Sequence, residues 1–400
     1  MHTAEYSDIS IALSQFLLKL SGVWMTMNNT EERRRIFAMV YTLVIHIFGL
    51  YLNLGDVYYS WNNLGHCTFL ICNTLCIILA MFKVLVLNIR RTEFKDLVLL
   101  AQQNFWHFKY NHREKILFMK CRRFCKLWTI TACSVTQAAL AFYLITPICA
   151  NIGKNKSDRI LPFKMWINFP LSVTPYYEIM FAIQVIVVEQ IGVSYLCNDN
   201  FLCILNMHVI YQFRMLQNRL LNLWKIIDKQ TNKADYADRC YTALKKCIRK
   251  HQSLIEFCDK LEYVYTLPIF GHMVVFSLLM CFDTYEILLA NVSIGTRLIF
   301  VFHMIGSFIH IIIFTYSCHC LMEESVNISL ATYSGWWTIL PMTETGRMIR
   351  KDISIIMMKS MRPCYLSAAG FFPVSLETST ALMSSTVSYF TLMRESSTRE

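Results

Sequence analysis

Acidic and histidine side chains occur in pairs within two apolar stretches of the sequence. Asp283 and Glu286 are three residues apart and His303 and His310 are seven apart, so each pair can share one face of a helix. Two histidines without a third ligand are more often packing residues than a metal site. The two carboxylates either reach an interface with water or attract cations. Neither pair predicts catalysis.

No catalytic motif accompanies these residues. The sequence contains no glycine-rich phosphate loop, no HExxH zinc motif and no nucleophile elbow. The sixteen cysteines are scattered without paired CxxC modules, which predicts small buried side chains, with Cys67 and Cys149 as one candidate disulfide. We therefore expect no enzyme, no cofactor and no metal.

The last apolar stretch carries a stripe of small and polar side chains. They recur at steps of three or four residues, in the order Glu377, Ala381, Ser384, Ser388, Thr391 and Glu395. Close packing between helices explains such a stripe. The wall of a hydrated pore explains it as well, with Leu392 as a hydrophobic gate and Glu395 favouring cations. The candidate pore residues are Ser384, Ser388, Thr391, Leu392 and Glu395.

Aromatic and sulphur-containing side chains gather in other apolar stretches. Most are expected to be core residues, but such walls also suit a small volatile ligand, which binds through dispersion and desolvation. The candidate ligand-binding residues are Phe69, Cys72, Phe142, Tyr143, Tyr176, Tyr177, Met180, Phe181, Phe300, Met304 and Phe308.

Membrane-spanning helices are needed to position these side chains. Of 400 residues, 55% are hydrophobic and 16% are charged, whereas a soluble domain carries about 25% charge. Apolar runs long enough to cross about 30 Å of hydrocarbon cover residues 37–57, 64–89, 127–150, 174–205, 266–290, 296–322 and 365–393. We expect an all-α polytopic membrane protein with seven transmembrane helices. Gly370 and Pro373 divide the last run into a short entry helix, a break and a longer outer helix.

The distribution of lysine and arginine predicts the orientation. With a cytosolic N-terminus, the inner segments 1–36, 90–126, 206–265 and 323–364 hold thirty basic residues and the outer segments hold seven. This asymmetry predicts a cytosolic N-terminus and an extracellular C-terminus. It also accounts for the net charge of +11, so nucleic-acid binding is not expected. Lys83 lies within a span and is expected to snorkel toward the cytosol.

Two cytosolic segments are expected to be helical. Ile9, Phe16 and Leu20 share one face of an N-terminal amphipathic helix, which lies on the membrane or packs against the protein. Hydrophobic residues recur at helical spacing through 206–265. That segment predicts long helices below the membrane, paired within the protein or with other subunits.

Short sequence pieces near the C-terminus carry a family resemblance. In order they are Tyr333-Ser334-Gly335-Trp336-Trp337, Arg350-Lys351, Lys359-Ser360-Met361-Arg362-Pro363, Ala368-Ala369-Gly370-Phe371-Phe372 and Val387-Ser388-Tyr389-Phe390. Their order and spacing resemble the insect odorant receptor family. One departure is Trp337, which stands where this family usually has tyrosine.

The resemblance implies an odorant receptor that is one subunit of a tetrameric, odorant-gated, nonselective cation channel. In this family a variable tuning subunit assembles with a common odorant co-receptor, in the plasma membrane of the olfactory sensory neuron dendrite. The present chain lacks the long second-loop insertion of the co-receptor, so it resembles the tuning subunit. Its ligand would be a small hydrophobic volatile, and membrane lipid would surround it.

The resemblance also implies how the chain is divided. Residues 1–36 would be the cytosolic N-terminus, 37–205 would be spans one to four with the odorant pocket, and 266–322 would be spans five and six. The pocket would lie between the outer halves of spans two, three, four and six. Residues 206–265 and 323–372 would form the cytosolic anchor and the start of the last span, with Trp336, Trp337 and Tyr365 as subunit contacts. Residues 373–394 would line the pore, Leu392 would match the family gate, and 395–400 are the extracellular tail.

Three other classes of membrane protein are alternatives. A gustatory receptor shares this topology, but its usual Gln-Phe ending is absent from residues 387–393. A G-protein-coupled receptor would have the opposite orientation and an Asp-Arg-Tyr motif after its third span. A secondary transporter would show paired broken helices in its two halves, whereas only the last span is visibly broken here.

Overall fold

The computed structural model describes residues 8–61, 64–106, 108, 110–153, 155, 159–165, 171–223, 233–288, 294–334, 336–340 and 342–397. Within these ranges the chain is helical and contains no strand beyond one isolated bridge between Ser367 and Pro373. The helices are α1 Ile9–Leu20, α2 Asn29–Tyr59, α3 Leu64–Ile89, α4 Arg91–Ala101, α5 His112–Ala150, α6 Tyr176–Leu221, α7 Lys233–Leu288, α8 Ile294–Tyr333, α9 Glu344–Ser360 and α10 Leu376–Ser397. The chain is an all-α polytopic membrane protein.

Six described helices are long and apolar enough to cross a membrane, namely α2, α3, α5, α6, α7 and α8. Each overlaps one of the first six predicted spans over all but at most two of that span's residues. The seventh predicted span corresponds to α10, which has 22 residues but alternates serine and threonine with apolar residues. Several of its hydroxyl groups are satisfied within the helix, since Thr386, Ser388 and Thr391 each donate to the carbonyl four residues earlier.

The predicted entry helix of the last span is wrong. After α9 the chain runs without helix from 361 to 375, through a turn in which Ala369 and Gly370 have φ values of 51° and 79°. The backbone N–H of Ser367 donates to Glu262 Oε2 at 2.7 Å, and Thr266 Oγ1 donates to the Ser367 carbonyl at 3.2 Å. The left-handed turn and its contacts with α7 replace the helical hydrogen bonds expected from hydrophobicity alone.

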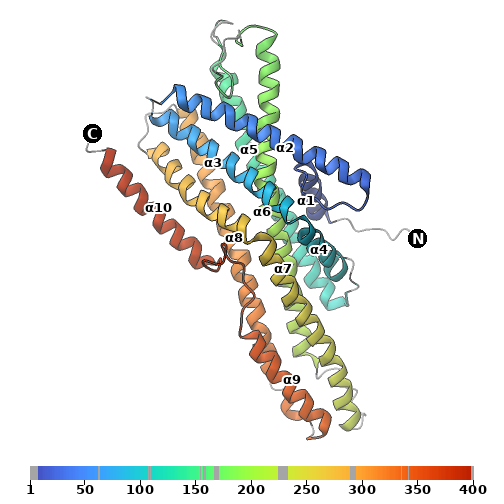
Figure 1. Cartoon of the computed structure of the whole chain (residues 1–400). Coiled ribbons are helices and arrows are strands. Elements are labelled where there is room, and N and C mark those ends of the chain that lie inside the picture. Colours follow the sequence, from blue (N-terminus) through green and yellow to red (C-terminus); the bar gives the residue numbers. More distant parts are fainter. Residues whose placement is uncertain are drawn as a thin grey trace.

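Helix α6 runs through the middle of an elongated bundle (Figure 1). All residues from 196 to 210 in α6 are buried, because α1, α2, α3, α5, α7 and α8 all pack against it. The expected long helices in 206–265 are confirmed, since α6 continues to Leu221 and α7 is continuous from Lys233 to Leu288. At one end of the bundle α9 packs against α7 and α8.

The N-terminal helix α1 docks through its small polar face. Ser14 and Leu18 are fully buried, and Asn200 Nδ2 of α6 donates to Ser14 Oγ at 3.0 Å. The opposite face exposes Ile9 and Phe16, which are 50% and 56% accessible. The helix therefore packs against the protein and also presents the apolar face that an interfacial helix needs.

Gly22, in the turn after α1, is expected to be required for the docking of α1. Its φ is +69°, and a Cβ there would lie 2.3 Å from the Met39 backbone nitrogen and 2.8 Å from the Arg35 carbonyl oxygen. Because backbone atoms cannot move aside easily, Gly22→Ala should undock α1 and cost about 2 kcal/mol or more of unfolding free energy. The matched control is Gly55→Ala in α2, where no atom lies within 4 Å of the added Cβ. Thermal unfolding of the two purified variants checks this, and equal melting temperatures would contradict it.

Candidate functional site

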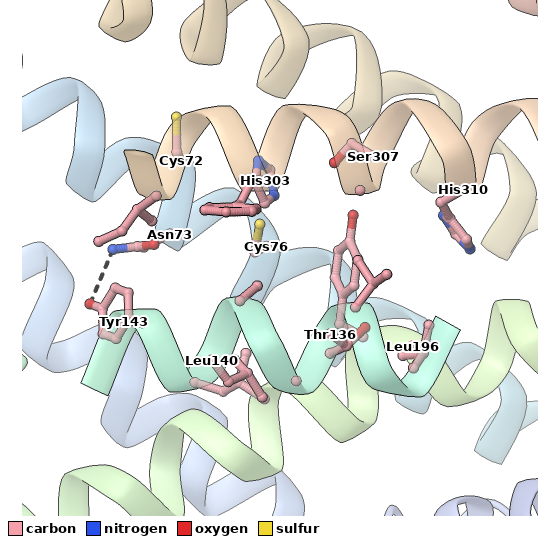
Figure 2. A pocket seen from close by; sticks show the side chains of 18 of the residues that line it. Cys72, Asn73, Cys76, Thr136, Leu140, Tyr143, Leu196, His303, Ser307 and His310 are labelled. Atoms are coloured by element: carbon pink, nitrogen blue, oxygen red, sulfur yellow. Dashed lines mark hydrogen bonds between the residues drawn. The ribbon is translucent and has the colours of Figure 1, made fainter. Parts of the chain in front are cut away.

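A cavity of about 240 Å³ lies among α3, α5, α6 and α8, with a contribution from α7. Figure 2 shows Asn73 and Tyr143 at one end and Leu196 and His310 at the other, and we name these the Asn73 end and the His310 end. The apolar lining residues include Phe69, Ile77, Trp128, Ala132, Val135, Ala139, Leu140, Val188, Ile191, Phe276, Ile299 and Phe300. Such a cavity binds an apolar body through dispersion and desolvation.

A short segment between α5 and α6 closes part of the cavity. Phe163 lines the cavity and is 5% exposed, and its ring centroid lies 5.6 Å from that of Tyr143. The fully buried amide of Gln184 holds this segment, since its Oε1 accepts from the Phe163 N–H at 2.8 Å and its Nε2 donates to the Phe163 carbonyl at 3.0 Å. This pair of bonds fixes the backbone of the segment over the cavity.

Aromatic and amide side chains shape the Asn73 end. Phe69 stacks on Tyr143 at 6.0 Å between centroids and meets Phe300 edge-on at 5.6 Å. Asn73 Nδ2 donates to Tyr143 Oη at 3.4 Å, the bond drawn in Figure 2. Edge-on and offset ring contacts of this kind hold aromatic walls in place while leaving polar edges for a ligand.

Four of the predicted ligand-binding residues line the cavity: Phe69, Cys72, Tyr143 and Phe300. The remaining candidates lie elsewhere. Phe142 stacks on Phe302 at 4.8 Å on an exposed face, and Met304 and Phe308 pack against the main core. The first turns of α6 contain the other four, Tyr176, Tyr177, Met180 and Phe181. Those seven residues do not line this cavity. The cavity-facing part of α6 begins at Val188, several turns further along the helix than expected.

Small residues on α6 create the space that the prediction missed. A Cβ at Gly192 would lie 2.5 Å from Leu140 Cδ1, so glycine allows α5 and α6 to approach each other beside the cavity. Tyr195 lines the cavity one turn further along. A prediction based on aromatic content alone places the ligand-binding residues of α6 in its first turns, and it therefore misses Gly192.

Four ionisable side chains from four helices meet behind the His310 end. Lys83 of α3 has no exposed surface, its Nζ donates to Asp199 Oδ2 of α6, and it lies 3.1 Å from His272 Nδ1 of α7. His310 of α8 lines the cavity and places Nε2 3.9 Å from the same Asp199 oxygen. We name Lys83, Asp199, His272 and His310 the buried cluster.

The predicted snorkelling of Lys83 is wrong, because the ammonium group is paired inside the bundle. A charge within a membrane helix is tolerated where a partner and further hydrogen bonds compensate its desolvation. Three of the four side chains, Asp199, His272 and His310, also have their ligand atoms within 4.8 Å of one another, as in a metal site. In this cluster the positive charge beside Asp199 comes from the Lys83 ammonium group, whereas in a metal site it would come from the metal ion.

A second set of ionisable groups lies toward the Asn73 end. His303 Nδ1 contacts Asp283 Oδ2 at 2.7 Å, and both residues line the cavity. Asp283 and Glu286 have no exposed surface. The expectation that the two carboxylates reach an interface with water is therefore wrong, and His303, expected to be a packing residue, pairs with Asp283.

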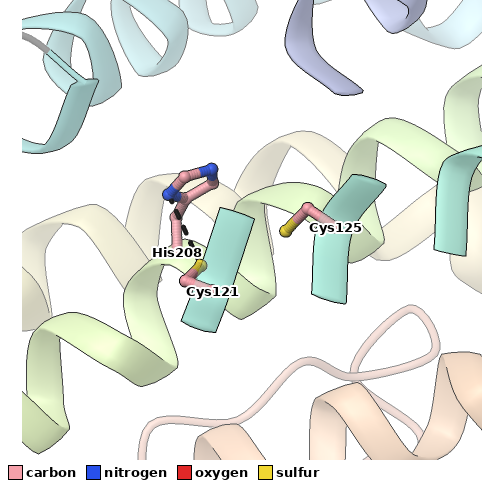
Figure 3. Close-up of side chains that lie close together, drawn as sticks. All are labelled: Cys121, Cys125 and His208. Atoms are coloured by element: carbon pink, nitrogen blue, oxygen red, sulfur yellow. Dashed lines mark hydrogen bonds between the residues drawn. The ribbon is translucent and has the colours of Figure 1, made fainter. Parts of the chain in front are cut away.

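Figure 3 shows a third cluster, in which Cys121 and Cys125 of α5 face His208 of α6. Cys121 Sγ lies 3.7 Å from His208 Nδ1, and all three side chains are buried. Structural zinc sites have four ligands, and among the described residues no fourth histidine, cysteine or carboxylate joins this group. The predicted pairing of Cys67 with Cys149 is also wrong, because both are free thiols.

The predicted pore stripe faces away from the bundle. Buried Ser379 and Thr386 lie on the side of α10 that packs against α7 and α8, whereas Ser384, Ser388 and Thr391 are exposed. Glu395 is also exposed, and the side chain of Leu392 lies outside the described residues. Packing within this chain therefore does not account for the stripe.

The proposed anchor residues lie near α9. Trp337 is partly buried against the main core and Tyr365 is 48% exposed, whereas the side chain of Trp336 lies outside the described residues. A tyrosine exposed to this degree is available for a contact with another subunit.

Comparisons with known proteins agree with this architecture. Residues 65–387 match the model of the family described as 7tm Odorant receptor. Odorant receptor 13a of Drosophila melanogaster is 21% identical over 97% of this chain and 96% of its own length. Odorant receptor Or2 of Anopheles gambiae is 26% identical over 59% of this chain and 61% of its own length.

A solved structure has the same fold. The insect olfactory receptor OR5 from Machilis hrabei, in complex with eugenol, superposes with a TM-score of 0.81 at 14% identity, covering 96% of this chain and 97% of that chain. The family match covers most of the described helices, including those that form the cavity. The chain therefore belongs to the odorant receptor family.

Proposed function

We propose that this odorant receptor is the ligand-specific subunit of an odorant-gated, nonselective cation channel. The observation that carries the proposal is the apolar cavity, because α7 and α8 contribute to its wall and the same two helices contact α10. A ligand in the cavity can therefore bias the position of the helix that carries the hydroxyl stripe. The complex of the similar receptor with eugenol supports a small aromatic volatile as the ligand.

The proposed mechanism is a shift between two populations. An odorant that binds the open arrangement more tightly than the closed one shifts the equilibrium toward the open arrangement. At saturation the equilibrium constant changes by the ratio of the two affinities. Movement of α7 and α8 would displace α10, so that Leu392 leaves the axis and Ser384, Ser388 and Thr391 face a hydrated path. Glu395 at the outer mouth would favour cations.

The proposed assembly is a tetramer with an odorant co-receptor subunit in the plasma membrane of an olfactory neuron dendrite. The N-terminus would be cytosolic and the C-terminus extracellular, as the basic residues indicate. The ends of α7 and α8 that pack with α9 would form the anchor between subunits, together with Trp336, Trp337 and Tyr365. The exposed stripe on α10 supports the assembly, since packing within this chain leaves that face of the helix uncovered.

Leu392→Ala tests whether this chain contributes to the pore. In cells that also express the co-receptor, we expect a higher leak current without odorant, because a smaller side chain weakens a hydrophobic gate. Leu298→Ala is the matched control, since Leu298 is 48% exposed on α8 and does not line the cavity. Whole-cell recording at equal surface expression makes the comparison. Identical leak in both variants would remove Leu392 as the gate.

A further inference from the structure

The carboxylates near the Asn73 end of the cavity have too few hydrogen-bond donors. Asp283 lines the cavity and has no exposed surface, and only its Oδ2 is bonded, to His303. Asp283 Oδ1 and both carboxylate oxygens of Glu286, one turn further along α7, have no partner. Three of the four carboxylate oxygens are therefore buried and unsatisfied, which is costly in an apolar environment.

The two ends of the cavity differ in charge balance. At the His310 end the carboxylate of Asp199 is matched by the ammonium of Lys83 and by His272. At the Asn73 end His303 contacts Asp283, and the carboxylate of Glu286 has no hydrogen-bond partner. Among the described residues, buried carboxylate oxygens that lack a donor occur at the Asn73 end and not at the His310 end.

The dimensions of the cavity limit which ligand can supply hydrogen-bond donors to these carboxylates. An apolar cavity of about 150 Å³ is large enough to hold benzene, so about 240 Å³ accommodates one ring with a short substituent. Trp128 and Val135 provide an apolar wall for the ring. A protonated amine provides up to three N–H donors and a positive charge on one small group.

We propose that Asp283, supported by Glu286, forms an acidic subsite that takes the ammonium group of a small arylalkylamine. The ring would lie toward the His310 end, and the ammonium group would donate to Asp283 Oδ1. This inference rests on the proposed function, because it assigns a ligand class to the same cavity. In this proposal Asp283 determines whether the receptor prefers a basic volatile or a neutral volatile of the same shape.

The test compares three probes of nearly equal shape: 2-phenylethylamine, 2-phenylethanol and propylbenzene. Dose–response currents are recorded from cells that express this chain with the co-receptor. The wild type is expected to respond to the amine at the lowest concentration. Asp283→Asn should raise the half-maximal concentration of the amine about tenfold or more relative to propylbenzene, since a charged hydrogen bond is replaced by a neutral one.

The matched control is Glu178→Gln at the start of α6. Glu178 pairs with Arg159 at 3.1 Å and does not line the cavity, so the ratio of amine to hydrocarbon sensitivity should not change. If Asp283→Asn does not reach the cell surface, Glu286→Gln is measured in its place and should lower the same ratio.

The outcomes separate the two proposals. An unchanged ratio in the surface-expressed variant overturns the acidic subsite, as does a wild type that prefers propylbenzene to the amine. Currents evoked by neutral probes but not by the amine would overturn the subsite and leave the proposed function intact. Absence of current with every probe, eugenol included, would overturn both.

Discussion

Replacing Lys83 with alanine is expected to lower the free energy of unfolding by about 3–5 kcal/mol, the usual cost of leaving one partner of a buried ion pair alone. Lys83 has no exposed surface, so its removal leaves the buried carboxylate of Asp199 without its ammonium partner. The remaining neighbours of that carboxylate are His272 at 3.1 Å and His310 at 3.9 Å. The measurement is thermal unfolding of the purified protein, together with the folded yield.

Two further variants make this prediction specific. The double replacement Lys83→Met with Asp199→Leu removes both charges and should recover most of the lost stability, because apolar residues of similar size often substitute for a buried pair. Lys126→Ala removes an exposed lysine of α5 and should have little effect. If Lys83→Ala unfolds at the same temperature as Lys126→Ala, the buried cluster does not stabilise the bundle.

Ser307→Phe is expected to weaken odorant binding about a hundredfold or more. Ser307 lies on α8 across the cavity from Thr136 (Figure 2), and a phenyl ring there would occupy the space a ligand needs. A ring inserted into a close-packed core is destabilising, but a cavity of about 240 Å³ has room for it. Saturation binding of eugenol to purified protein measures the effect.

The control for cavity filling is a phenylalanine on the outer face of the same helix. Ile305 is 49% exposed and does not line the cavity, so Ile305→Phe should leave the affinity for eugenol unchanged. Equal affinities for eugenol in the two variants would show that the ligand binds outside the cavity.

The long helices could be predicted because span length and hydrophobicity are local properties of the sequence. The boundaries of α3 and the continuation of α6 and α7 beyond their spans follow directly from apolar runs and helical periodicity. The stretch from 361 to 375 is the exception. There Gly370 and contacts from Glu262 and Thr266 of α7 outweigh hydrophobicity, and no local pattern encodes those contacts.

The cavity was harder to predict, because its wall depends on how helices rotate against one another. The residues of α3 and α8 nearest the Asn73 end were found from aromatic content, whereas on α6 the deciding residue is Gly192, which has no side chain to attract notice. Small residues allow helices to approach. The position of Gly192, three residues before Tyr195, was the signal in the sequence that could have moved the predicted pocket wall further along α6.

The buried cluster shows a different limit. A single lysine in an apolar run predicts snorkelling unless its partner is known, and the partners of Lys83 lie on α6, α7 and α8. One clue was present in the sequence: Asn198, Asp199 and Asn200 interrupt the most buried part of α6. Polar residues at such a position require partners from other helices.

The most direct test of the central claim is odorant-evoked current in membrane patches excised from cells that express this chain with the co-receptor, bathed without nucleotides. Without nucleotides no G-protein cascade can operate, so a current requires that the receptor itself forms the channel. The account predicts that the probe with the strongest whole-cell response, chosen from eugenol and the three phenyl compounds above, opens a cation conductance in wild-type and Ile305→Phe patches and not in Ser307→Phe patches. No current from wild-type patches that contain surface-labelled protein, or an equal current from Ser307→Phe, would contradict it.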